Sequence, residues 1–194
     1  MLVENKENLS PVKTKEKVIQ QTVALIIEKG YHGTGVNEIL RATKIPKGSF
    51  YHHFPKGKDE LVTEALRSST IKLSMQYKKL LKESESLQEG LEKLLDHSKA
   101  ELQSSKYKAR SILVNVSQEV GSINKSLQAT CKQLFELIIN ALESFFHEHN
   151  IDTWQESARS FYTRLQGAIV LSKAYQTTSF LDDHRSEVSL NKGL

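Results

Sequence analysis

The sequence is poor in the features that crosslink a chain or anchor it in a membrane. Its 194 residues include a single cysteine, Cys131, so no disulfide can form within the chain. One cysteine fits a reducing compartment, and we expect a cytoplasmic protein. No apolar run approaches the 18 or more residues of a membrane span, and the polar N-terminus has no signal-peptide core. We therefore expect a globular protein that does not enter a membrane.

Proline and glycine are scarce and unevenly distributed. All three prolines lie in the first 55 residues, and five of the nine glycines lie between Gly30 and Gly57. After Pro55 the chain has no proline to break a helix, and no stretch of any length alternates apolar and polar residues as a strand would. The pattern predicts an all-α protein with a compact, turn-rich N-terminal third followed by longer helices.

The residue patterns of common enzymes and metal sites are also absent. The sequence has no nucleophile-elbow glycines, no phosphate-binding loop, and no HExxH or CxxC spacing. A metal site at His52 and His53 is the other interpretation of that pair, but adjacent residues on a helix point in different directions and rarely chelate together. We therefore expect a protein that is not an enzyme and has no metal and no cofactor.

Acidic residues are missing between Arg41 and Lys58, where five lysines or arginines stand. The formal net charge is only +4, so the distribution matters more than the total. Residues 1–60 carry ten basic against seven acidic side chains. A local excess of this kind favours a polyanionic partner.

This basic stretch has the pattern of a helix-turn-helix. Two short helical segments flank a break at residues 44–46, and the second segment runs from about Lys47 to His53. We predict that Thr34 caps the first segment through its hydroxyl. We also predict that Pro46 takes the first position of the second segment, where a missing N–H is harmless.

The second segment has one apolar and one polar face. Phe50 and Phe54 stand four residues apart and are expected to face inward together. Core packing of Tyr51 is the alternative to surface exposure, but the two phenylalanines already supply the inward face. The outward residues offer charge, hydroxyls and bare backbone to phosphates and base edges: Lys47, Gly48, Ser49, Tyr51, His52 and His53.

The rest of the chain shows apolar residues at spacings of three and four. A first helix covers residues 13–29 and ends at Gly30, and it is needed to cover the inner face of the next two. The other predicted helices cover residues 58–81, 87–102, 112–120, 127–146, 154–175 and a part of 179–190.

Residues 30–39 (GYHGTGVNEI) and 46–54 (PKGSFYHHF) resemble TetR-family transcriptional regulators, and the likeness extends over essentially the whole chain. Residues 54–61 (FPKGKDEL) contain one residue more than the usual turn of the family, and they look like the branch of the LmrA-type multidrug repressors. The resemblance implies a homodimer of about nine helices per subunit. It implies a DNA-binding domain over residues 1–57 and a ligand-binding and dimerisation domain over residues 58–194.

The resemblance also implies roles for individual residues. The family's DNA-contacting positions fall on Thr34, Lys47, Gly48, Ser49, Tyr51, His52 and Lys58. The candidates for a small-molecule pocket are Tyr107, Asn115, Gln118, Phe135, Trp154, Tyr162 and Gln166. For each of them, packing in the core or exposure on the surface is the alternative. For close helix pairing in the dimer the candidates are Leu165, Ala168, Ile169 and Ser172.

The expected function is a ligand-responsive DNA-binding regulator. In this hypothesis a homodimeric repressor binds a palindromic operator on double-stranded DNA, and a small-molecule effector releases it by changing the tilt of the fourth helix. The alternative is a ligand-binding or assembly protein of the same fold that has lost DNA recognition. Cys131 lies on the apolar face of a helix, which favours a structural role over redox sensing.

Overall fold

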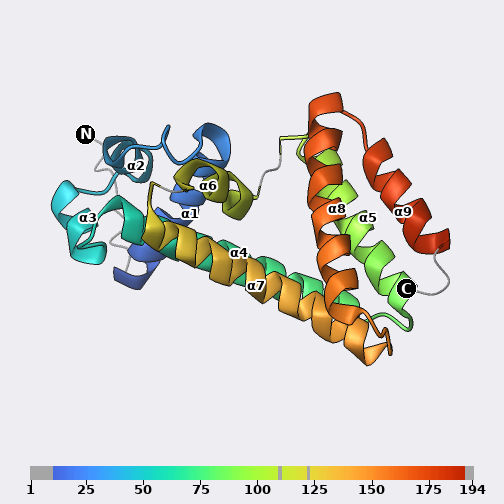
Figure 1. Ribbon diagram of the computed structural model, residues 1–194. Coiled ribbons are helices and arrows are strands. Elements are labelled where there is room, and N and C mark those ends of the chain that lie inside the picture. The colour runs from blue at the N-terminus through green and yellow to red at the C-terminus, as the bar shows by residue number, and fades with distance from the viewer. Residues whose placement is uncertain (1–10, 109–110, 122, 191–194) are drawn as a thin grey trace. The chain divides into compact units, whose positions relative to one another are not determined.

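In the computed structural model, residues 11–108, 111–121 and 123–190 are described, and within them the chain forms nine helices and no strand (Figure 1). The all-α prediction is confirmed, and each predicted helix appears within a few residues of its expected bounds. Residues 1–10 of the predicted DNA-binding domain lie outside the described part. The helices are α1 (Pro11–Lys29), α2 (Val36–Thr43), α3 (Lys47–His53), α4 (Lys58–Lys82), α5 (Leu87–Ser104), α6 (Ile112–Val120), α7 (Lys125–Glu148), α8 (Trp154–Tyr175) and α9 (Ser179–Leu190).

The chain divides into two compact units. The first contains residues up to 69 together with 111–131, and the second contains 70–110 together with 132–194. Helices α4 and α7 each belong partly to both units, whereas α6 belongs wholly to the first. The predicted domain boundary between residues 57 and 58 concerns function and stays a prediction. The division by packing differs from this boundary, because α6 contacts α1 and is grouped with the N-terminal helices.

The core of the first unit is built by α1 to α4. Val18 of α1, Ile39 of α2 and Leu61 of α4 surround Phe50 and Phe54, and all five are fully buried. The rings of Phe50 and Phe54 lie 5.6 Å apart between centroids. The prediction that these two rings face inward is confirmed. Their burial fixes the other face of α3 on the surface.

Two local predictions about the helix-turn-helix are wrong. Thr34 does not cap α2, since the N-cap is Gly35 and no side chain caps that end. The Thr34 hydroxyl instead donates 2.8 Å to the carbonyl of Gly30, one of the carbonyls left over at the end of α1. Pro46 is the N-cap of α3 and not its first residue, with an extended backbone at φ −63° and ψ 147°.

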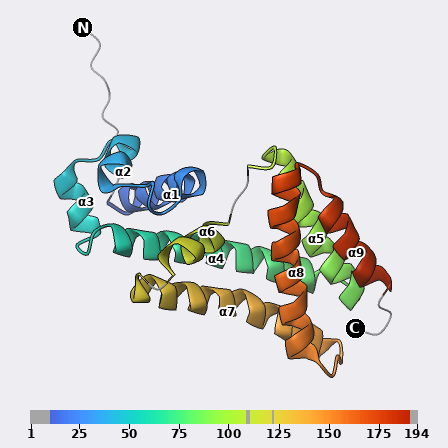
Figure 2. The same cartoon turned by 45° about the horizontal axis from the view of Figure 1, so that its top comes forward.

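In the second unit, α5, α8 and α9 pack side by side (Figures 1 and 2). Ion pairs join α5 to α9: Arg185 contacts Glu92 at 2.9 Å and Asp96 at 2.5 Å. Gly90 of α5 leaves room for the ring of Phe145 on α7, because a Cβ built there would lie 2.3 Å from that ring. The packing of the Phe145 ring against α5 therefore favours glycine at this position.

Candidate nucleic-acid interface

Helix α3 presents the polar face that the sequence predicts. Lys47, Gly48 and His52 are exposed, and Tyr51 is 41% exposed with its ring edge-on to Phe50 at 5.1 Å. Ser49 and His53 are half-buried. The contact with Phe50 supports the Tyr51 ring from one side only. Its outer edge is therefore available to a partner, while contact with DNA stays a prediction.

Gly48 is not required by the packing of this chain. A Cβ built at this position would meet no atom within 4 Å. Glycine inside a helix is destabilising by roughly 0.5–1 kcal/mol relative to alanine. A glycine that nothing in the chain demands fits a surface at which an outside group comes close to the backbone.

The charge around α3 is positive because the nearby acidic side chains already have partners. Glu38 pairs with Lys29, which lowers the pKa of Glu38 through a hydrogen bond and charge. Glu60 accepts the backbone N–H of Lys56 at 2.8 Å. The basic side chains around α3 are all exposed, and none of them forms an ion pair within the described residues. They are Arg41, Lys44, Lys47 and Lys56.

The two predicted DNA contacts outside α3, Thr34 and Lys58, differ in their exposure and in their hydrogen bonds. Thr34 is fully buried and its hydroxyl is used by Gly30, so we leave it out of the proposed contact set. Lys58 is half-buried, and its ammonium donates 2.6 Å to the carbonyl of Tyr31 while lying 3.8 Å from the centre of that ring. An ammonium has three N–H groups. Lys58 therefore retains donors for a phosphate and stays in the set.

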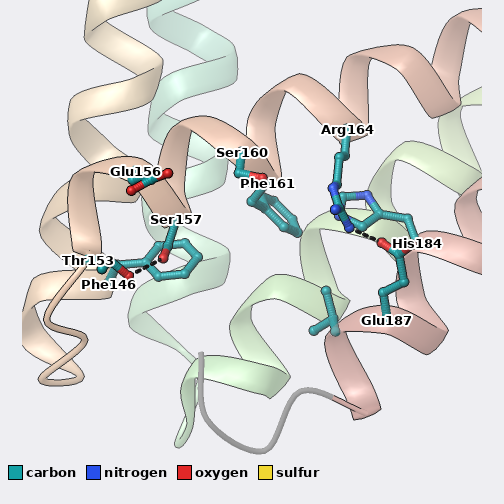
Figure 3. A pocket seen from close by; sticks show the side chains of 10 residues that line it. Phe146, Thr153, Glu156, Ser157, Ser160, Phe161, Arg164, His184 and Glu187 are labelled. Carbon is teal, nitrogen blue, oxygen red and sulfur yellow. Dashed lines mark hydrogen bonds and ion pairs between the residues drawn. The ribbon is translucent and has the colours of Figure 1, made fainter.

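The second unit contains a groove between α8, α9 and the end of α7 (Figure 3). Its volume is about 350 Å³. Arg164 pairs with Glu187 at one end, and the hydroxyls of Thr153 and Ser157 lie 3.0 Å apart at the other. None of the seven predicted ligand residues lines the groove. The lining is Phe146, Thr153, Glu156, Ser157, Ser160, Phe161, Arg164, His184, Glu187 and Val188.

Only part of the predicted ligand set comes together in space. The rings of Phe135 and Tyr162 pack with centroids 6.5 Å apart, and burial raises the pKa of Tyr162. Asn115 and Gln118 lie on α6, which belongs to the first unit. The remaining candidates also belong to the second unit, Tyr107 after α5 and Trp154 and Gln166 on α8, where Gln166 stands one turn after Tyr162.

Sequence reasoning missed two residues close to the Phe135 and Tyr162 pair. Tyr77 is buried, and its electrostatic interaction with Tyr162 helps to raise the pKa of the Tyr162 phenol, after burial itself. His97 stacks edge-on against Tyr77 with centroids 6.2 Å apart. Its buried Nε2 makes no hydrogen bond to the described residues, and a carboxylate oxygen of Glu101 lies 3.9 Å away. Neither residue stands out in the apolar periodicity of its helix.

The predicted pairing face of α8 is buried inside the chain. Leu165 and Ser172 are fully buried and Ala168 is 7% exposed, so these residues are not available to a second subunit. Ile169 is half-buried. Burial speaks against the predicted role for Leu165, Ala168 and Ser172, while the role of Ile169 stays a prediction. A row of small and apolar residues on a helix serves equally well inside one subunit. The exposed stripe of α8 lies next to it, at Ser160, Arg164, Gly167 and Leu171.

Other chemistry finds little support in the described residues. No group of three histidine, cysteine or acidic side chains there could hold a metal ion. Cys131 is buried, and burial raises the pKa of its thiol, which disfavours the reactive thiolate. None of the described helices combines the length and the apolar character needed to cross a bilayer.

Comparisons with known proteins cover both halves of the chain. A model described as "Bacterial regulatory proteins, tetR family" matches residues 18–65. A second, described as "Transcriptional regulator LmrA/YxaF-like, C-terminal domain", matches residues 88–187.

Individual relatives agree with these matches. The chain is 43% identical to the HTH-type transcriptional regulator LmrA of Bacillus subtilis over 53 residues, which cover 27% of this chain and 28% of that one. It is 26% identical over 180 residues to an uncharacterised HTH-type regulator of Lactococcus lactis, covering 88% of this chain and 89% of the relative. A TetR-family regulator from Agrobacterium tumefaciens has the same fold, with a TM-score of 0.82 at 16% identity over 93% and 98% of the chains.

Proposed function

The chain belongs to the TetR family of bacterial transcriptional regulators, and from this premise we propose that it is a repressor that binds a palindromic operator as a homodimer and is released by a small molecule. The relatives are named as regulators of transcription, so the expectation of a DNA-binding regulator rather than an enzyme is confirmed. Repression, the dimer, the palindrome and the effector are parts of the proposal.

The observation that carries the proposal is the exposed face of α3. Lys47, Tyr51 and His52 project from a helix whose opposite side is locked by Phe50. The alternative, a protein of this fold that has lost DNA recognition, is less favoured because α3 carries no acidic side chain. A face of this kind suits the major groove, which admits a helix and displays base edges.

For the dimer we propose the exposed stripe of α8. Ser160, Arg164, Gly167 and Leu171 follow one another at spacings of three and four, so they share one side of the helix. A Cβ at Gly167 would meet nothing within 4 Å, which leaves room for a second helix to approach closely. Ser160 and Arg164 also line the α8–α9 groove, and we assign that groove to the same interface.

For the effector we propose the aromatic cluster of the second unit, around Tyr77, His97, Phe135 and Tyr162. A buried polar atom without a hydrogen bond is costly. The Nε2 of His97 lies 3.9 Å from Glu101 but hydrogen-bonds to no described residue, and a ligand that contacts it would supply that bond. Helices α4 and α7 run through both units, so a ligand-dependent change in the second unit reaches the first along continuous helices. Couplings of this kind are typically about 1–3 kcal/mol.

The proposal is tested by selecting duplexes from a random pool with the full chain. We expect enrichment of one inverted repeat and binding that weakens steeply with salt. A protein with six to ten phosphate contacts loses about a thousandfold or more in affinity between 50 and 200 mM salt. A pool that remains random after repeated rounds would refute DNA recognition, and enrichment of a site without symmetry would refute the palindrome.

A further inference from the structure

The segment that contains α6 has an unusual position in the chain. The backbone passes between the two units at three places, within α4, just before α6 and within α7. Residues 111–131 are therefore joined covalently to the second unit at both ends, although they pack in the first unit.

Glu119 of α6 makes the central contact. Its carboxylate accepts the backbone N–H of Tyr31 and that of His32, both at 2.9 Å, in the turn between α1 and α2. The backbone carbonyl of Glu119 also lies 3.3 Å from Nε2 of His32. Hydrogen bonds to an ionised carboxylate are about twice as strong as neutral ones. One side chain thus satisfies two adjacent amides that no helix supplies with partners.

Gly30 makes room for this carboxylate. Its φ of 78° is a conformation that side chains disfavour, and a Cβ there would lie 2.4 Å from Oε1 of Glu119. The turn therefore needs glycine both for its backbone and for the approach of Glu119. Any larger residue at position 30 would displace the carboxylate.

Tyr31 connects the same turn to the first turn of α4. Its carbonyl accepts from Lys58 at 2.6 Å, and its phenol donates to Asp59 at 2.6 Å. Asn124, which follows α6, donates 2.8 Å to the other oxygen of Asp59. Burial, followed by the hydrogen bond to Asp59, raises the pKa of Tyr31 to about 12, so the phenol remains a donor. The α6 segment thus contacts the turn before α2 and the helix after α3.

We propose that Glu119 is a positioning residue for DNA binding: it holds the turn before α2 from the α6 segment and, together with the Asn124–Asp59 bond, fixes the orientation in which α3 is presented. The inference rests on the proposed function, because it concerns the same DNA-reading face. Specific binding requires this orientation, whereas the attraction of lysines to phosphate does not. A displacement of the segment therefore affects sequence recognition before it affects general affinity for DNA.

The test measures the affinity of the Glu119→Gln variant and of the unaltered chain for the selected operator and for a random duplex of equal length. A glutamine keeps one acceptor and turns an N–H donor toward the second amide. We expect specific affinity to fall about tenfold, the equivalent of one charge-assisted hydrogen bond, and affinity for the random duplex to be unchanged. The amides of Tyr31 and His32 should exchange hydrogen faster. The matched control is Glu136→Gln, which removes only an exposed pair with Lys132.

The outcomes separate this inference from the proposed function. If the unaltered chain selects no duplex, the proposed function fails. If it does, and Glu119→Gln binds the operator equally well, the positioning role is wrong. An equal loss on both duplexes with a lower melting temperature would also contradict it, since that indicates unfolding.

A double-mutant cycle with Gly30→Ala provides a second test. Alanine at position 30 displaces the carboxylate, so adding Glu119→Gln to Gly30→Ala should cost no further operator affinity. Additive losses would contradict the proposed contact.

Discussion

Replacing both Lys47 and Tyr51 with alanine should weaken operator binding by at least about a hundredfold while leaving the melting temperature unchanged. Both side chains project from α3, and Lys47 has no ion-pair partner among the described residues. Base-edge contacts are worth about 1–3 kcal/mol each, and a hundredfold corresponds to about 2.7 kcal/mol. The two losses reach this value together if each side chain contributes about 1.4 kcal/mol.

The two single variants should differ in kind. Lys47→Ala should reduce the dependence of affinity on salt by about one ion per subunit of the proposed dimer, because each phosphate contact releases a counterion. Tyr51→Ala should weaken binding with little change in that dependence. The control is Lys78→Ala on the exposed side of α4 in the second unit, which should bind as the unaltered chain does. Full affinity in the double variant would remove α3 as the reading surface.

Replacing Leu171 with glutamate should convert the proposed dimer into monomers. Leu171 is 43% exposed and lies on the stripe with Gly167, where the structure leaves room for another helix. In an interface with two-fold symmetry each substitution appears twice, so two carboxylates would be buried close together without partners. We expect a monomer by sedimentation at micromolar concentration, and a loss of operator affinity of more than about a hundredfold.

The control for this variant is Met75→Glu. Met75 is 67% exposed on α4, so the substitution makes the same change in charge at an exposed apolar position outside the stripe. It should leave both the association state and DNA binding unchanged. A Leu171→Glu chain that still sediments as a dimer would show that the interface lies elsewhere.

The sequence predicted the helices well because their apolar residues recur with the period of the structure. Phe50 and Phe54, four residues apart, identified the inner face of α3 and thereby its outer face. Pro46 located the break between α2 and α3 to within one residue. These are local properties, and local spacing determines them.

What the sequence could not predict depends on contacts between distant residues. Glu119 reaches Tyr31 across 88 positions, and nothing in the spacing of either residue indicates the contact. The predicted pairing face of α8, with Leu165, Ala168 and Ser172, has the small and apolar residues of a dimer interface, but these residues are buried inside one subunit. Periodicity shows that a face is buried without showing what covers it.

We propose that the outer face of α3 enters the major groove of the operator. The most direct measurement is a methylation-protection footprint, which reports access to guanine N7 in that groove. We expect two protected segments related by symmetry, with centres about 10–10.5 base pairs apart or a multiple of that distance, and we expect both to be lost in the Lys47 and Tyr51 double variant. Protection confined to the minor groove, or protection that survives the double variant, would contradict it.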